Sequence, residues 1–87
     1  MYSLMPTVFV DGLPPHFKTE HLRELGAAFG DVKSAFVATQ RSGDSLGFGY
    51  VVFSSLSEAR HAVNALKGIE IMGKALTIYI ADSGEQN

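Results

Sequence analysis

The sequence contains no cysteine and no long hydrophobic run. Without cysteine the chain can form neither a disulfide bond nor a cysteine-based zinc finger or knuckle, which favours a reducing compartment. None of its apolar runs reaches the ~18 residues that a membrane-spanning helix needs, so we expect no membrane partner. The apolar opening stretch has no basic segment and is interrupted by Asp11, which argues against a signal peptide.

An excess of positive charge is also missing. Seven Lys and Arg against nine Asp and Glu give a net charge of −2 at pH 7 and a pI of about 5.8. Because nucleic-acid-binding domains usually carry a basic surface, this balance argues against tight RNA binding by this chain alone. It fits weak affinity, a protein partner, or a basic region elsewhere in a longer protein.

The sequence does contain enough apolar residues for one small domain. Hydrophobic residues make up 46% of its 87 positions, and six Phe and three Tyr supply much of the area that a core can bury. We place the domain at residues 7–81, with flanking tails at 1–6 and 82–87. Local composition predicts four strands and a hairpin-like excursion; the strands are 8–10, 32–39, 47–53 and 75–81, and the excursion is 69–74.

Two helices are predicted between these strands. Apolar residues recur at i, i+3 and i+7 from Leu22, which predicts a helix that has Thr19 as its N-cap and runs to about residue 29. Ser55 and Glu58 form a Ser-x-x-Glu capping box, which predicts the start of a second helix that ends at residues 67–68.

The resulting order of elements is β-α-β followed by β-α-β. Each unit places its helix on the same face of the sheet, so the other face is left uncovered. We therefore predict an α+β fold of the ferredoxin-like class, a four-stranded antiparallel sheet with two helices on one face.

Two segments carry a more specific pattern. Residues 46–53 read Leu-Gly-Phe-Gly-Tyr-Val-Val-Phe, and residues 8–13 read Val-Phe-Val-Asp-Gly-Leu. They resemble the two signature segments of the RNA recognition motif (RRM) family. The octapeptide departs from the family pattern only at Leu46, where Lys or Arg is usual, and the hexapeptide has Gly12 where Asn is frequent. The resemblance extends over nearly all of the chain.

The alternation of side chains along each strand predicts which residues face away from the helices. Five aromatic residues fall on that uncovered face: Phe9, Phe36, Phe48, Tyr50 and Tyr79. Ala38 joins them by the same alternation, in a strand where a bulge would shift the faces. A monomeric protein seldom exposes a large apolar patch without a use, so we expect a binding surface here.

The RRM resemblance implies a role for three of these rings. Phe9, Phe48 and Tyr50 match the family's stacking positions, which implies binding of single-stranded RNA at roughly 1–3 kcal/mol per stacked base. Packing under a terminal segment or a partner chain is the competing interpretation. Alternation alone adds Phe36 and Tyr79, for which a base contact and an ordinary half-buried strand residue both stay open.

Charged residues near the predicted RNA path are few. Lys33, Arg41 and Lys74 could reach backbone phosphates, whereas the other Lys and Arg residues belong to helices or helix ends, where solvated charge is expected. Asp11 adds a carboxylate to the uncovered face. It repels phosphate but can accept a hydrogen bond from a cytosine amino group or a guanine edge, and it can equally bond its own turn.

An enzyme is the first alternative, and the sequence argues against it. The Gly-x-Gly at residues 47–49 lacks the third glycine of a dinucleotide-binding motif and lies in a predicted strand. The three His have no Cys or Glu partners at metal-ligand spacing, and no nucleophile-elbow motif is present. We therefore expect no catalytic residue, no metal and no cofactor.

A protein-binding RRM is the second alternative, favoured by the acidic balance and the exposed rings. The family's peptide-binding variant carries Arg-x-Phe before the last strand, and residues 72–75 lack it. Another protein partner, or a weak homodimer through the aromatic face, stays open. We predict a module that binds single-stranded RNA within a longer RNA-processing or mRNA-regulatory protein, located in the nucleus, the cytoplasm or both.

Overall fold

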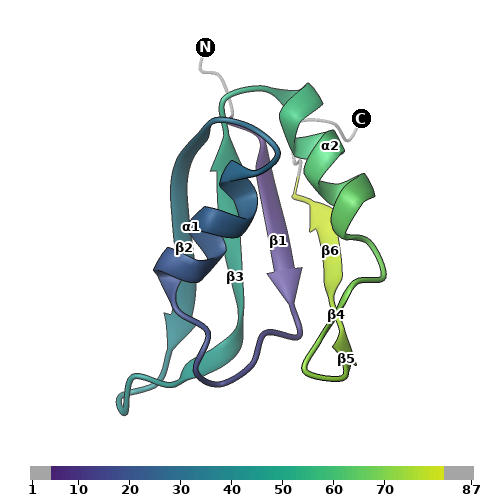
Figure 1. Cartoon of the computed structure of the whole chain (residues 1–87). Helices are drawn as coiled ribbons and strands as arrows, with labels where there is room; N and C mark the ends of the chain where they lie inside the picture. The colour runs from purple at the N-terminus through teal and green to yellow at the C-terminus, as the bar shows by residue number, and fades with distance from the viewer. Residues whose placement is uncertain (1–4, 82–87) are drawn as a thin grey trace.

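The computed structural model describes residues 5–81 (Figure 1). Its elements are β1 (Thr7–Asp11), α1 (Thr19–Ala27), β2 (Val32–Thr39), β3 (Ser45–Phe53), α2 (Leu56–Leu66), β4 (Glu70–Ile71), β5 (Lys74–Ala75) and β6 (Thr77–Ile80). The predicted order of helices and strands is confirmed, and the excursion predicted at 69–74 corresponds to the small hairpin of β4 and β5, which extends one residue further, to Ala75. The tail predicted at 82–87 lies outside the described residues.

The main sheet has the strand order β2-β3-β1-β6, and every neighbouring pair is antiparallel. Both helices lie on one side of it, α1 over β2 and β3 and α2 toward β6 (Figure 1). The predicted ferredoxin-like class is therefore confirmed. Because the helices cover a single face, no element formed by residues 5–81 lies over the side chains on the other face of the sheet.

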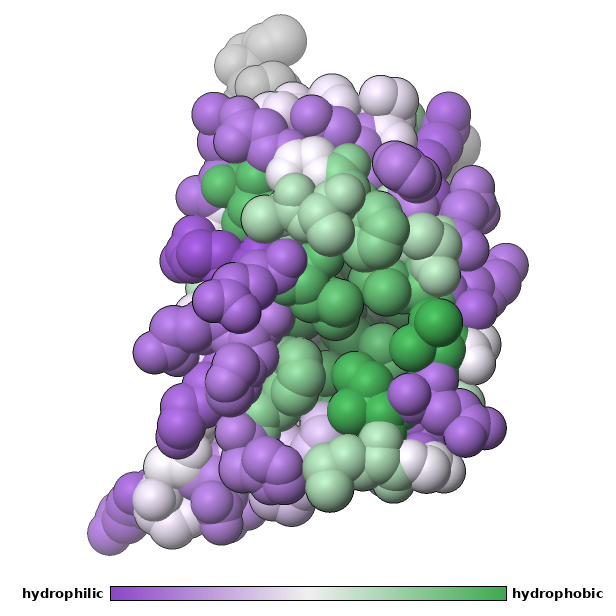
Figure 2. Space-filling view, in the orientation of Figure 1, coloured by the Kyte–Doolittle hydropathy of each residue, from purple (hydrophilic) through white to green (hydrophobic). Residues whose placement is uncertain are grey.

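The core lies between the sheet and the helices. Its most deeply buried large side chains are Phe53, Leu22, Val8, Val10 and Val37. The space-filling view from the helix side shows a band of hydrophobic residues over the middle of this face, bordered by hydrophilic residues (Figure 2). Partly buried residues that pack against the core include Leu25, Phe29 and Val63. The helices are thus amphipathic, as their spacing predicted.

The strand ends differ slightly from the prediction. β3 begins at Ser45, and β6 begins at Thr77 because Ala75 pairs with Glu70 in the β4–β5 hairpin. The two residues of that hairpin's turn, Met72 and Gly73, have φ values of 54° and 81°. Positive φ at both central positions is what a two-residue hairpin turn of type I′ requires.

β2 departs from simple alternation. Its pairing with β3 shifts between Val32 and Ser34 and again between Val37 and Thr39. Ala38, which was predicted to face away from the helices, is buried, with 9% relative exposure. That prediction is wrong because the irregularity interrupts the period of two on which it depends.

The start of α1 also corrects the prediction. Lys18 occupies the N-cap, Thr19 is the first helical residue, and the helix ends at Ala27 rather than near residue 29. The Thr19 hydroxyl does not cap the helix but accepts a hydrogen bond from the Val37 backbone N–H (3.0 Å), which joins α1 to β2. The Lys18 N–H donates to His21 Nδ1 at 2.9 Å.

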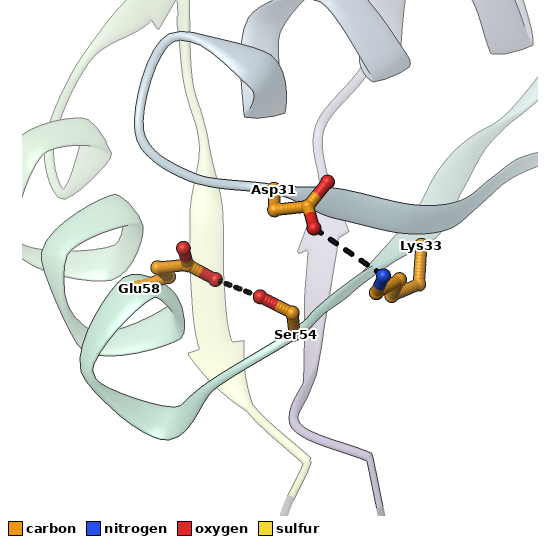
Figure 3. A network of polar contacts seen from close by, with 4 residues as sticks. All are labelled: Asp31, Lys33, Ser54 and Glu58. Atoms are coloured by element: carbon orange, nitrogen blue, oxygen red, sulfur yellow. Dashed lines mark hydrogen bonds and ion pairs between the residues drawn. The ribbon is translucent and has the colours of Figure 1, made fainter.

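The start of α2 follows the prediction at Ser55, which is the N-cap and accepts a hydrogen bond from the Glu58 N–H (3.2 Å). The Glu58 carboxylate accepts a hydrogen bond from the Ser54 hydroxyl, with 2.6 Å between the oxygens (Figure 3). This bond is the main reason why the pKa of Glu58 is lowered from its ordinary value; backbone bonds at Asp31 and Ser55 add to the lowering, and desolvation opposes it.

Replacing Ser54 by alanine should raise the pKa of Glu58. Because the pKa is lower in the folded state than in the unfolded state, the bond stabilises the fold above the unfolded pKa, and this contribution is lost as the pH falls through the folded pKa. An NMR titration of the Glu58 carboxyl group measures the change. Ser42→Ala, in the β2–β3 turn, is the control that should leave the titration unchanged, and equal curves for wild type and Ser54→Ala would contradict the assignment.

Candidate nucleic-acid interface

A row of aromatic side chains crosses the sheet on the face away from the helices. The strand register pairs Phe36 with Tyr50, Tyr50 with Phe9, and Phe9 with Tyr79. Because the sheet order is β2-β3-β1-β6, each strand contributes one ring to the row. The residues that flank these rings along β1 and β6, such as Val10 and Ile78, are buried in the core on the opposite face. The aromatic row is therefore defined as Phe36, Tyr50, Phe9 and Tyr79.

The rings of the aromatic row touch one another in sequence. The ring centroids of Phe36 and Tyr50 are 5.6 Å apart and those of Phe9 and Tyr79 are 5.8 Å apart, both pairs tilted. Phe9 and Tyr50 meet edge to face, at 6.2 Å and 87°. The outer rings Phe36 and Tyr79 keep 48% and 53% relative exposure, while the central pair is half-buried. These contacts support each ring and leave surface free for a planar ligand.

Phe48 lies one step along the strands from the aromatic row. It pairs with Asp11, which pairs in turn with Thr77, so these three residues form a second row across β3, β1 and β6. Phe48 is 47% exposed. Asp11 is exposed, and its Oδ1 accepts a hydrogen bond from the Gly12 N–H at 2.9 Å. The five predicted aromatic residues thus share one face, and Asp11 lies beside them.

Two glycines position Phe48 from either side. Gly47 has a φ of +98°, a backbone conformation that residues other than glycine rarely adopt. Its carbonyl oxygen accepts hydrogen bonds from the N–H groups of Gly12 (2.8 Å) and Leu13 (2.9 Å). Gly49 packs against the backbone of β2 so closely that a Cβ atom there would overlap the carbonyl oxygen of Phe36. The Gly-x-Gly of the octapeptide is therefore explained by backbone geometry.

The predicted cations lie at the edges of this face. Lys33, at the start of β2, forms an ion pair with Asp31, with 3.3 Å between Nζ and Oδ2 (Figure 3). Arg41, in the turn between β2 and β3, and Lys74, in β5, are exposed. The β2–β3 turn and the β4–β5 hairpin lie at the same end of the molecule, where β1 ends and β3 begins (Figure 1). None of the three belongs to the aromatic row.

Thr77 belongs to the second row of the candidate interface, although the sequence patterns did not mark it as a site residue. Its alternation with Tyr79 already placed it on the uncovered face. Its pairing with Asp11 depends on the register between β1 and β6, which are separated by most of the chain. No sequence signal sets that register, so the second row was not predicted.

Other kinds of site find little support in the part of the chain that the structure describes. Residues 5–81 contain no group of three or more His, Asp or Glu side chains arranged to hold a metal ion. No helix in that range is long and apolar enough to cross a membrane.

The chain is similar to several known proteins. It is 39% identical over 84 residues to "Small ribosomal subunit protein mS86" of Arabidopsis thaliana, covering 94% of this chain and 54% of that protein. It is 38% identical over 79 residues to "Polyadenylate-binding protein 4" of Arabidopsis thaliana, covering 91% of this chain and 12% of that protein. The chain thus spans about half the length of the first relative and a small part of the second.

Solved structures and family models agree with these relatives. A crystal structure of "RNA Binding Protein PG1" superposes with a TM-score of 0.81 at 34% identity, covering 90% of this chain and 94% of that one. The family model described as "RNA recognition motif" matches residues 8–77, which include both signature segments and the aromatic rings of β1, β2 and β3. The chain therefore belongs to the RNA recognition motif family.

Proposed function

We propose that this domain binds single-stranded RNA by stacking bases on the aromatic row and on Phe48. The observation that carries the proposal is the register that aligns Phe36, Tyr50, Phe9 and Tyr79 across all four strands of an uncovered sheet face. Each base stacked on an aromatic ring contributes roughly 1–3 kcal/mol, whichever of the four bases it is. Several adjacent rings can therefore hold a short stretch of bases without a strongly basic surface.

The relatives support this proposal through what their names say of them. One is a polyadenylate-binding protein, and the superposing structure is that of an RNA-binding protein. Both curated relatives are longer than this chain, which supports the view that the domain acts as one module of a longer RNA-processing or mRNA-regulatory protein. Neighbouring modules would raise the affinity through effective concentration. The proposal includes no catalytic step and no cofactor. We expect the protein to act in the nucleus, the cytoplasm or both.

An NMR titration with pooled short single-stranded RNAs tests the proposal. We expect the largest chemical-shift changes at β1 and β3, around Phe9, Phe48 and Tyr50, with smaller changes at β2 and β6. Changes confined to α1 and α2, or no changes at millimolar RNA, would contradict it. The same spectra show which members of the pool are preferred.

Protein binding through the same face is the second candidate function. The observation that favours it is the near-half exposure of Phe36, Phe48 and Tyr79 on a domain of net charge −2, since exposed apolar patches invite association. Sedimentation at increasing protein concentration distinguishes the two functions. A dimer that RNA dissociates uses the aromatic face, whereas a dimer that persists with bound RNA uses the helix side.

The proposed interface predicts an unusually weak dependence on salt. Since Lys33 is paired with Asp31 and Leu46 replaces the usual cation, we expect a log–log salt slope that corresponds to about one to two phosphates. Leu46, which is 52% exposed in β3, should tighten binding and steepen the slope when it is changed to Arg. Leu56→Arg adds the same charge at the start of α2 and should change the slope less. A steep slope for the wild type would contradict the prediction.

A further inference from the structure

A hollow beside the β1 and β6 end of the aromatic row combines aromatic rings with polar side chains. It encloses about 230 Å³ and is lined by Phe9, Val10, Asp11, Phe48, Thr77 and Tyr79. Pockets for drug-sized ligands usually measure about 300–1,000 Å³, so this hollow suits a smaller, flat group. Its aromatic walls are rings that the proposed function already uses for stacking, and its side-chain polar groups are the Asp11 carboxylate and the hydroxyls of Thr77 and Tyr79.

The Asp11 carboxylate is not needed to satisfy the turn that follows it. Its Oδ1 accepts a hydrogen bond from the Gly12 N–H, but that N–H also donates to the carbonyl oxygen of Gly47 at 2.8 Å. The turn amide therefore keeps an acceptor without the side chain. Among residues 5–81 the ion pair that forms joins Lys33 to Asp31, so no described cation neutralises Asp11. An ionised carboxylate has about four acceptor sites, and only one of those on Asp11 is used within this part of the chain.

A carboxylate can only accept hydrogen bonds, so beside a stacked base it favours bases that present a hydrogen-bond donor at their edge. Cytosine presents an amino group at the ring position where uracil presents a carbonyl oxygen, and the two bases are otherwise close in size. A carboxylate accepts a hydrogen bond from the amino group, whereas facing the uracil oxygen it leaves both acceptors unpaired. The same carboxylate repels phosphate, so its presence on an RNA-binding face favours a role toward the base.

We propose that the hollow lined by Asp11, Phe48 and Thr77 receives a base that carries an exocyclic amino group, in preference to uracil. The inference rests on the proposed function, because it assumes that RNA lies on this face. It assigns Asp11 a role in specificity, and it places Thr77 as a neighbouring hydroxyl that can donate or accept at the edge of the same base.

The test compares binding of two single-stranded RNAs of about eight nucleotides, oligo-C and oligo-U, by fluorescence anisotropy. We expect the wild type to prefer oligo-C by at least about fivefold, the lower end of the discrimination that a good side-chain contact to a base provides. Asp11→Asn should reduce the preference to near unity, because the amide donates as well as accepts. It keeps an oxygen that can bond the Gly12 N–H, so the turn is retained.

Asp44→Asn is the matched control, since it removes the same charge from the exposed β2–β3 turn. It should leave the ratio of the two affinities unchanged, even if both affinities rise. Equal binding of both RNAs by the wild type would overturn the inference and leave the proposed function intact, whereas no binding of either would overturn both. A change of ratio in Asp44→Asn equal to that in Asp11→Asn would also overturn it.

A second measurement does not depend on the variant folding. In the wild type, the amide shifts of Gly12, Phe48 and Thr77 should move further with saturating oligo-C than with saturating oligo-U. Equal shifts for the two RNAs at these three amides would overturn the inference.

Discussion

Replacing Phe48 and Tyr50 together by alanine should abolish measurable binding of single-stranded RNA while the far-UV circular dichroism spectrum stays native. Two stacking rings at roughly 1–3 kcal/mol each predict a loss of affinity of at least about thirtyfold. Tyr50 also contacts the rings of Phe9 and Phe36, so its removal loosens two further members of the aromatic row. The fold should survive because neither side chain belongs to the buried core.

A double variant elsewhere on the surface controls for the loss of apolar area. Leu56 and Ile69 are exposed, one at the start of α2 and the other just after its end. Leu56→Ala combined with Ile69→Ala should leave the affinity for RNA within about twofold, since isolated exposed apolar side chains carry no stacking role. If Phe48→Ala with Tyr50→Ala binds RNA as the wild type does, the sheet face is not the RNA-binding surface.

Gly49→Ala should destabilise the domain by about 3 kcal/mol, the upper part of the range for overpacking a tight site. A Cβ atom at this position would overlap the Phe36 carbonyl oxygen and lie 3.0 Å from the Val37 Cα. Both neighbours are backbone atoms of β2, which cannot rotate away as a side chain can. For a domain of this size the change corresponds to a melting temperature lower by about 12–24 °C. Urea denaturation of the wild type and the variant measures the difference in the free energy of unfolding.

Gly43→Ala is the matched comparison for this substitution. Gly43 has a φ of +97°, and a methyl group added to its Cα would meet no atom within 4 Å, so alanine there encounters only backbone strain, about 1 kcal/mol. The steric explanation predicts that Gly49→Ala costs clearly more than Gly43→Ala. Similar losses for the two variants would show that β2 moves aside easily, and the contact between Phe36 and Tyr50 would then be less rigid than the structure implies.

The periodicity of the sequence was sufficient to predict the fold and most of the faces. Alternation in β1, β3 and β6 is regular, so the period of two alone assigns Phe9, Phe48, Tyr50 and Tyr79 to the uncovered face. The same rule failed at Ala38 because a shift in pairing changes the period locally. Alternation predicts faces, and it works only where the ladder of hydrogen bonds is uninterrupted.

What local patterns could not predict were relations between distant segments. The alignment of the aromatic row and the pairing of Asp11 with Thr77 both depend on strand register, which the packing of the whole domain sets. Thr19 illustrates the same limit, since its hydroxyl was predicted to cap a helix but bonds Val37 in β2.

The carbonyl oxygen of Gly47 has a thermodynamic consequence for recognition. By accepting hydrogen bonds from both Gly12 and Leu13, it fastens the end of β1 to the beginning of β3. Asp11 and Phe48, which flank this junction, are thereby held in a fixed relative position before any ligand arrives. A preorganised surface loses little conformational entropy on association, so most of the ordering cost falls on the flexible RNA strand. Stiffening the RNA in its bound conformation, rather than rigidifying the protein, is then the more effective way to strengthen the complex.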